Sequence, residues 1–419
     1  MKPQNLEETL VWYYITGTYV LLFLGAQYIF APMLAWFLVL YLIKKLWEQT
    51  EETPVEERIS IPLGVWIWIV SMLTIGLALV VGHLEFNLGT IKTIKSFVNA
   101  FLRTWALLAV FPLIGCLKIR PQLIYRAICI LGIQTLVLVP VSYLLSIAGV
   151  PMPLFTNHIF AKIGGNITRY YAATLYLSEG GATRLSLFAP WSPALALAAN
   201  IHIVLAEQEQ NKKLRYLAII GNVAAILGSA SRLGLLCLIS LPIIRLVLVN
   251  LARPSMQIAL GISSFLAGLF GSQLLLMAKN FKDYFDSRRA ASSRVRNILG
   301  RLAIDKWHEA PIWGHAVKSP EGPYVAARMP IGSHHTWFGA LYLHGLVGFI
   351  ALAIPMLYTL ISLLIKAQQS KIAQTGLALI LVMFIFSLAE NLEGLAFLYW
   401  PGLMMLGIAF KEEFSPTFV

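Results

Sequence analysis

The chain alternates long apolar runs with short polar linkers. Runs of about 18 residues or more are long enough to cross a hydrocarbon core of roughly 30 Å as an α-helix. Because a backbone in lipid must satisfy its own hydrogen bonds, these runs predict membrane-spanning helices. We place them at about 8–24, 28–47, 61–82, 97–117, 121–148, 187–206, 213–230, 232–250, 256–278, 333–365, 371–389 and 394–411. The pattern predicts an all-α, polytopic membrane protein with about 12 transmembrane helices.

The run at 333–365 is too long for one straight crossing. Gly345 and Gly348 lie inside it, and Pro355 follows. We therefore expect this helix to be broken, or to begin outside the bilayer. No repeat or separable soluble segment is visible, so residues 1–419 are interpreted as a single integral membrane domain.

The short linkers set the expected orientation. Their basic residues fall on one side of the predicted helices: Lys44, Lys45, Lys118, Arg120, Arg126, Lys212, Lys213, Arg215, Arg253, Lys366 and Lys371. By the positive-inside rule that side is the cytoplasm, which also places both termini there. Two longer segments, an outer loop at 149–186 and a long loop with short helices at 279–332, then face outside. The start of the chain is mixed in charge and is not expected to be a cleaved signal.

Composition fits a membrane protein, since 58% of the residues are hydrophobic and 12% are charged. Because the net charge of +12 must be weighed loop by loop, it does not indicate nucleic-acid binding. The outer segment 279–332 carries about ten Lys and Arg against about five Asp and Glu, without a topological reason to be basic. This favours an anionic ligand there, with contact to lipid headgroups as the alternative.

The sequence lacks the motifs of several common enzyme classes. The chain has no phosphate-binding GxxxxGK[ST] loop, no HExxH, no CxxC and no GxSxG elbow. Cys116, Cys129 and Cys237 lie in or beside apolar runs without metal-ligand spacing. We therefore predict no metal and no cofactor. Carboxylates are almost absent from the predicted helix interiors, which weakens a proton-coupled transporter.

Arginines recur where the predicted helices reach the outer face. Arg232 stands at the tip of the small-residue turn GSASRLG at 228–234, where it either clamps an anion or reaches headgroups. If residues 292–308 form a surface helix, Arg294 and Arg301 share one face and Arg296 points elsewhere. Guanidinium groups suit phosphate oxygens, but an interfacial helix without a ligand has the same composition.

The stretch GSHHTW at 332–337 is placed at the mouth of a membrane helix. With Ser333 as the N-cap, His334 and His335 would lie in the first turn, where the helix dipole keeps an imidazole neutral as a general base requires. Arg184 at another outer helix mouth is a weaker candidate. Glu390 and Glu393 either orient a hydroxyl or pair with an arginine. This combination of arginines, a neutral base and apolar surroundings favours a lipid-linked diphosphate as the ligand.

Three short motifs between about 180 and 350 share a known arrangement. They are Ser231-Arg232-Leu233-Gly234, Arg296 about fifteen residues before Pro311 and Gly314, and 332–337 leading to Gly345-Leu346-Val347-Gly348. This arrangement resembles the O-antigen ligase and O-antigen polymerase superfamily of membrane glycosyltransferases. The resemblance implies inverting, metal-independent transfer of a glycan from undecaprenyl diphosphate to an acceptor, at a periplasmic active site in the bacterial inner membrane.

The resemblance also implies roles for individual residues. His334 would be the base for the acceptor hydroxyl, while Arg232 and Arg296 would hold the donor diphosphate and stabilise its developing charge. Arg184 matches a family arginine less securely, and Arg294 and Arg301 are added as diphosphate ligands from local geometry. Many members have Asn or Ser after the histidine; here it is His335, which stays an alternative base.

Several functions remain open at this point. The expected partners are an undecaprenyl-diphosphate-linked glycan donor, a lipid A-core or glycan acceptor, and membrane lipids, without nucleic acid. A ligase and a polymerase would share donor, fold and catalytic residues. A protein O-oligosaccharyltransferase is a third variant. The rival from another class is a transporter or flippase of a lipid-linked glycan, which needs arginines along a central path, where Arg103 is the clearest candidate.

Overall fold

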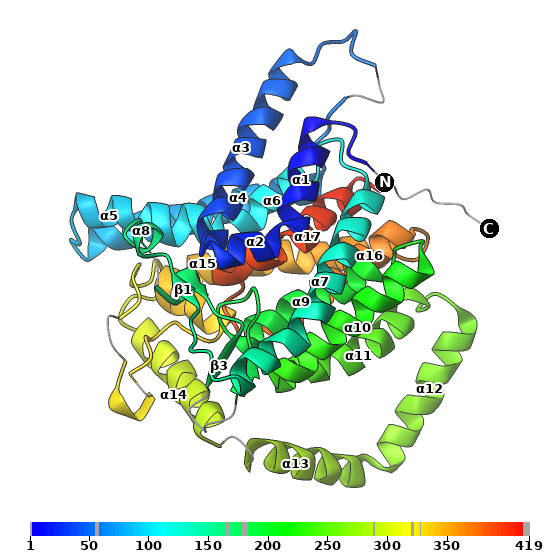
Figure 1. Ribbon diagram of the computed structural model, residues 1–419. Helices are drawn as coiled ribbons and strands as arrows, with labels where there is room; N and C mark the ends of the chain where they lie inside the picture. Colours follow the sequence, from blue (N-terminus) through cyan, green and yellow to red (C-terminus); the bar gives the residue numbers. More distant parts are fainter. Residues whose placement is uncertain are drawn as a thin grey trace.

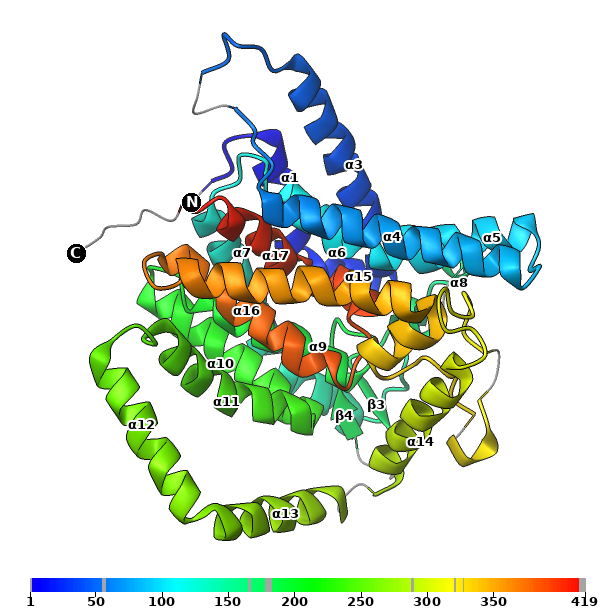
Figure 2. The same cartoon turned by 180° about the vertical axis from the view of Figure 1, so that it is seen from behind.

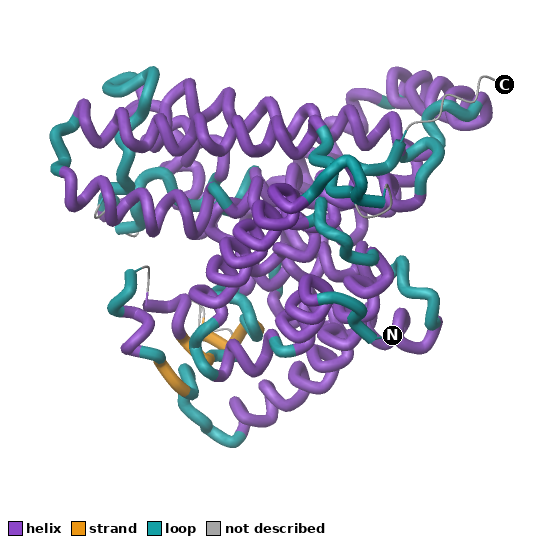
Figure 3. Tube along the Cα trace, turned by 90° about the horizontal axis from the view of Figure 1, so that it is seen from above, coloured by secondary structure: helices purple, strands orange, loops and turns teal. Residues whose placement is uncertain are grey.

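The computed structural model describes residues 2–54, 58–164, 167–177, 183–287, 290–319, 322–326 and 328–413, without the side chains at 177, 278, 281–293 and 326. Helices dominate this part of the chain, and two short antiparallel strand pairs lie beside them (Figures 1 and 3). The helices are α1 Leu6–Thr16, α2 Thr18–Phe23, α3 Gln27–Glu48, α4 Leu63–Glu85, α5 Thr90–Ser96, the π-helix η1 Phe97–Trp105, α6 Leu107–Ile114, α7 Pro121–Ile147, α8 His158–Ala161, η2 Ile167–Tyr170, α9 Ser192–Ala206, α10 Lys212–Ser229, α11 Arg232–Val249, α12 Pro254–Leu269, α13 Gly271–Ser287, α14 Ala290–Trp307, η3 Tyr324–Ala326, α15 Thr336–Lys366, α16 Lys371–Ser387 and α17 Leu392–Phe410. The strands are β1 Phe155–Thr156, β2 Tyr171–Ala172, β3 Leu175–Leu177 and β4 Thr183–Leu185, with β1 paired to β2 and β3 to β4.

Six of the described helices are long and apolar enough to cross a membrane: α3, α4, α7, α11, α15 and α17. Two bent pairs raise this number to eight if each pair is one span. The remaining apolar helices, α9 and α16, are shorter. A mainly helical architecture with six to eight candidate membrane spans is therefore confirmed, while the number of twelve spans stays a prediction.

Helix α17 forms the centre of the bundle, because every one of its residues is buried. Its backbone touches that of α6: a Cβ added at Gly407 would lie 1.9 Å from the Pro112 carbonyl oxygen, and one at Gly115 would lie 2.2 Å from that of Met404. Small residues permit such close packing between membrane helices. This central helix carries the candidate site at its N-terminal end.

The basic linkers that the sequence places on one side meet at one end of the bundle. Arg120 pairs with the buried Glu8 at 2.6 Å, and Arg126 pairs with the buried Glu209 at 2.7 Å. Lys411 donates to the Cys116 carbonyl at 2.9 Å. These contacts join the N-terminus with the linkers before α7, before α10 and after α17. These basic linkers therefore lie at one end of the bundle, as predicted. The location of that end in the cytoplasm stays a prediction.

Helix α15 is broken as the sequence predicts, since Gly345 has φ +63° and ψ −160° inside it. Its start differs from the prediction. The N-cap is His335 and not Ser333, so both histidines precede the helix. The Ser333 hydroxyl donates to the Pro330 carbonyl at 2.6 Å instead, and His334 has a φ of +64°, which no helical residue adopts.

The run predicted as one helix at 256–278 is two helices that meet at 82°. Gly271 begins α13, whose second half, AKNFKDYFDS, is too polar to continue a membrane span. Figures 1 and 2 show α12 and α13 as an arm that stands away from α10 and α11. The arm leads the chain to α14, which packs against α15 at the end of the bundle opposite the basic linkers.

Candidate functional site

Glu390 lies in the turn between α16 and α17, and its side chain is 3% exposed. Its Oε1 is 3.4 Å from Nη2 of Arg296 on α14, and its Oε2 accepts a 3.0 Å hydrogen bond from the Trp191 indole. Burial raises the pKa of Glu390, although Arg296, the Trp191 bond and Arg184 each act to lower it. The ion pair therefore joins the outer helix α14 to the central helix bundle.

A network of hydrogen bonds fixes the histidine loop to the same turn. The Thr336 hydroxyl donates to the Glu390 carbonyl at 2.6 Å and accepts the Leu392 N–H at 3.0 Å. Asn391 accepts the His335 N–H at 3.1 Å and donates to the Gly332 carbonyl at 3.2 Å. Loop 332–336 is thus held against the start of α17, beside Arg296.

His335 has a structural task in this loop. Its Nδ1 accepts the Phe338 N–H at 3.3 Å as the N-cap of α15, and the two rings lie against each other with centres 4.1 Å apart and planes tilted by 31°. Capping satisfies a backbone donor that would otherwise be left without a partner at the helix start. One ring nitrogen of His335 is therefore occupied within the protein.

His334 is half-buried and sits in the left-handed region with φ +64°. Its Nε2 lies 2.9 Å from the Met329 sulfur, which is a weak acceptor. Burial lowers the pKa of His334 to about 4, assisted by the charges of Arg296 and Lys318. The imidazole is therefore neutral at pH 7 and able to accept a proton.

Arg184 and Arg232 meet at the turn between α10 and α11. Arg184 on β4 donates from Nε to the Ser229 carbonyl at 2.9 Å and from Nη2 to the Ala230 carbonyl at 3.1 Å. It thereby closes the C-terminal end of α10, where a cation is favourable. The half-buried Arg232 follows as the first residue of α11, N-capped by Ser231. The charge of Arg184 also acts to lower the pKa of Glu390, so this turn lies near the Arg296–Glu390 ion pair.

Arg294 and Arg301 lie elsewhere on α14, as the helical period predicts. Both are exposed, whereas Leu299, Gly300 and Ala303 are buried. A Cβ at Gly300 would lie 3.1 Å from the Phe338 ring, so this buried face packs on α15. The structure brings Arg296 to Glu390 and leaves Arg294 and Arg301 on the solvent side.

Sequence reasoning missed a second group of charges beside the histidines. Lys318 acts electrostatically on His334 and is itself affected by Glu393 and Arg169. Lys318 follows Gly314 by four residues in the basic outer segment, so its charge was one available signal. Nothing in the local pattern of Arg169 distinguishes it from other loop arginines.

Two of the predicted loops are described only in part. Residues 165–166 and 178–182 of the outer loop 149–186, and residues 288–289, 320–321 and 327 of segment 279–332, lie outside the described residues. Among the described residues, no three His, Cys, Asp or Glu side chains form a group that could hold a metal ion. Compared with protein-family models and with curated proteins, the sequence matches none.

Proposed function

We propose that this protein is a membrane glycosyltransferase that moves a glycan from undecaprenyl diphosphate to an acceptor hydroxyl. One observation carries the proposal: a neutral histidine, His334, is held beside Arg296 where several apolar helices end. A base that accepts a proton and a cation that stabilises a departing phosphate are the two groups that such a transfer needs. The proposed site faces the periplasm of a bacterial inner membrane, with both termini in the cytoplasm.

The proposed reaction is a single displacement. His334 takes the proton of the acceptor hydroxyl, whose oxygen forms a bond to the anomeric carbon. The bond from that carbon to the phosphate oxygen breaks, and the diphosphate leaves with the electron pair. Attack from the face opposite the leaving group inverts the anomeric centre.

Arginines would bind the donor and stabilise the negative charge of the leaving group. Arg296 is the best placed, because its side chain is 38% exposed while its guanidinium also contacts Glu390. Arg232 would bind a phosphate oxygen from the first turn of α11, where the helix dipole also favours an anion. Arg184 would act by holding this turn through its bonds to Ser229 and Ala230.

The structure favours His334 over His335 as the base in this proposal. His335 uses Nδ1 to cap α15 and packs on Phe338, whereas the contact of His334 with Met329 can be exchanged for a substrate. Arg294 and Arg301 are left out of the proposed donor site because they are exposed on the other face of α14.

The test is transfer by purified protein in detergent with EDTA. Undecaprenyl-diphosphate-linked oligosaccharide is the donor, and lipid A-core and glycan acceptors are offered separately. We expect glycan transfer with release of undecaprenyl diphosphate, and the acceptor used distinguishes a ligase from a polymerase. Donor binding without release of undecaprenyl diphosphate, with either acceptor, would instead favour a transporter or flippase of the same lipid-linked glycan.

A further inference from the structure

A stack of one tyrosine and two arginines lies at the outer end of α3. The Cζ atoms of Arg103 and Arg169 each lie 4.4 Å from the centre of the Tyr28 ring, which is 2% exposed. Guanidinium groups are attracted to the electron-rich face of an aromatic ring. The ring thus holds two positive charges close together, one from the π-helix η1 and one from the outer loop.

The two arginines differ in what else they contact. Arg103 donates to the Asn99 side chain at 2.8 Å, to the Gly164 carbonyl at 3.2 Å and to the Tyr170 hydroxyl at 3.0 Å. Arg169 has a buried Nε without a hydrogen-bond partner among the described residues. Arg103 therefore holds the outer loop in place, whereas the Nε of Arg169 is left unsatisfied by the described residues.

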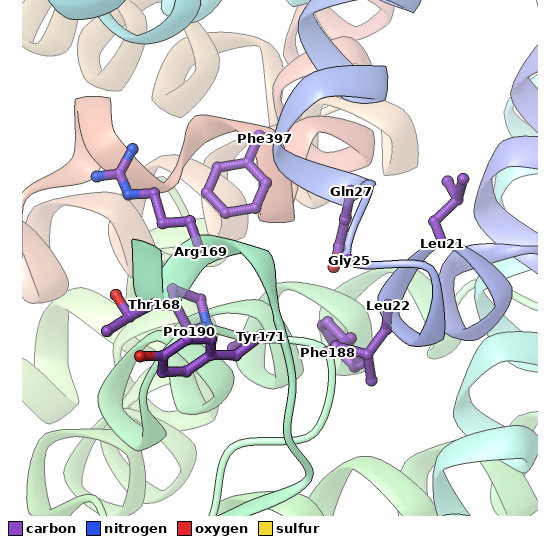
Figure 4. A pocket seen from close by; sticks show the side chains of 11 residues that line it. Leu21, Leu22, Gly25, Gln27, Thr168, Arg169, Tyr171, Phe188, Pro190 and Phe397 are labelled. Atoms are coloured by element: carbon purple, nitrogen blue, oxygen red, sulfur yellow. The ribbon is translucent and has the colours of Figure 1, made fainter. Parts of the chain in front are cut away.

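Arg169 reaches the start of the central helix α17. A Cβ added at Gly394 would meet Nη2 of Arg169 at 3.1 Å and no other described atom within 4 Å. Figure 4 shows the Arg169 guanidinium beside Phe397 of α17, turned away from Leu22 and Phe188. A cation at a helix N-terminus is unfavourable unless an anion accompanies it.

Lys318 and Glu393 complete the group. Lys318 is exposed at the surface. Partial loss of hydration lowers its pKa, while Glu393 acts to raise it and Arg169 to lower it. Glu393 is 6% exposed; its Oε1 accepts from Asn391 at 2.9 Å, and its buried Oε2 has no partner in the described part of the chain. A buried polar atom without a partner costs free energy, about 1–3 kcal/mol, which a bound ligand would recover.

The charges of this group do not balance among the described residues. In that part of the chain, Arg103, Arg169 and Lys318 are accompanied by one carboxylate, that of Glu393, since Glu390 is paired with Arg296. We propose that Arg169 and Lys318 bind a phosphate group of the acceptor, while Glu393 accepts a hydrogen bond from one of its sugar hydroxyls. This acceptor site rests on the proposed function, which it deepens by naming the chemistry of the acceptor.

The position of His334 connects the two sites. Asn391 accepts the His335 N–H and donates to the Gly332 carbonyl, which holds the loop of His334 at the start of α17, and the charges of Arg296 and Lys318 both act to lower the pKa of its ring. A donor diphosphate at Arg296 and an acceptor phosphate at Lys318 would bring the anomeric carbon and the attacking hydroxyl to the same imidazole. Holding both reactants in this way lowers the entropic cost of the reaction.

The test compares acceptors with and without phosphate on Arg169→Gln and Lys318→Gln. The acceptors are lipid A-core, lipid A-core after phosphatase treatment, and a lipid-diphosphate-linked oligosaccharide. We expect each variant to raise KM for the phosphorylated acceptor about 10-fold or more and to change KM for the donor less than about 2-fold. The dephosphorylated acceptor should bind wild type and variants equally. A rise in KM for lipid A-core would identify lipid A as the source of the phosphate. A rise for the lipid-diphosphate-linked oligosaccharide would identify a second lipid diphosphate as the source.

Matched controls are Arg253→Gln and Lys44→Gln, which remove exposed charges from the basic-linker end of the bundle. Arg169→Lys should restore part of the acceptor affinity. Gly394→Ala, which crowds Nη2, should weaken acceptor binding with every charge retained. Size-exclusion chromatography and thermal unfolding identify a variant that does not fold, in which case Gly394→Ala serves as the test.

Acceptor binding in the absence of donor separates this inference from the proposed function. If wild type binds phosphorylated lipid A-core or the lipid diphosphate more tightly than Arg169→Gln does, the acceptor site stands even when no transfer occurs. Equal binding by wild type, Arg169→Gln and Lys318→Gln would overturn the site. An equal rise in KM for donor and acceptor would also overturn it, because the residues would then bind the donor.

Discussion

His334 and His335 are adjacent in the chain, yet the fold gives their rings different surroundings. His335 accepts a backbone N–H of its own helix and packs on Phe338. His334 has a left-handed backbone conformation, the charges of Arg296 and Lys318 act on its ring, and its Nε2 contacts the Met329 sulfur. Two adjacent residues of one motif can therefore have different surroundings, one of them fixed as a helix cap and the other left beside positive charges.

Removal of the base should have the largest effect. We expect His334→Ala to lower the rate of transfer by about 10²- to 10⁴-fold, the range typical of a lost general base, while donor binding stays near wild type. Single-turnover transfer with prebound donor measures the first quantity, and donor titration measures the second. A wild-type rate in this variant would contradict the assignment of His334, and not His335, as the base.

Removal of the neighbouring cation comes next. Arg296→Ala should lower transfer by about 10²-fold, because it removes a donor to the leaving group and leaves the buried Glu390 carboxylate without its partner. Arg296→Lys should restore the charge but not the fork geometry, and so recover only part of the rate. Steady-state rates at saturating donor test this order. Equal rates for wild type and both variants would contradict it.

The pH dependence tests the low pKa of the histidines. Burial first, and then Arg296, lowers the pKa of both rings from 6.5 to about 4. Transfer should therefore stay constant as pH falls through 6.5 and decline only near pH 4. The unfolded chain takes up these protons first, so stability should decrease as pH falls from about 6.5 toward 4. In Arg296→Ala the decline of the rate should begin at higher pH, as a pH-rate profile would show.

Loss of the cap should have a smaller effect on transfer than on folding. His335→Ala removes the acceptor for the Phe338 N–H, which should cost about 0.5–2 kcal/mol of stability. Transfer by the folded variant should remain within a few-fold of wild type. Chemical denaturation measures the loss of stability, and single-turnover rates on the same sample measure transfer. A loss of rate as large as that of His334→Ala would make His335 the base.

The smallest effect is expected from the exposed face of α14. Arg294→Ala and Arg301→Ala should each change transfer less than about 2-fold, because both side chains face solvent while Arg296 faces Glu390. Initial rates at subsaturating donor are the sensitive measurement. A rise in donor KM comparable with that of Arg296→Ala would return these arginines to the diphosphate site.

Much of the fold could be predicted because its determinants are local. Apolar runs predict helices, Gly345 predicts the break in α15, and the helical period separates Arg296 from Arg294 and Arg301. The start of α15 was predicted wrongly because Ser333 is a favoured N-cap residue, whereas the positive φ of His334 keeps the chain out of the helix, so that the N-cap is His335, two residues later.

The second charge group could not be predicted for a different reason. Tyr28, Arg103 and Arg169 come from three distant segments, and Lys318 and Glu393 come from two more. They come together only because the outer loop, the segment after α14 and the start of α17 meet at one end of the bundle. No local pattern encodes that meeting, so only the three-dimensional arrangement reveals it.

The configuration of the product tests the central claim most directly. One displacement with His334 as base and a diphosphate leaving group must invert the anomeric centre of the transferred sugar. NMR of the new glycosidic linkage, compared with that of the donor, measures this. The account predicts the opposite anomer in the product; retention of the donor configuration would require a second displacement and would contradict it.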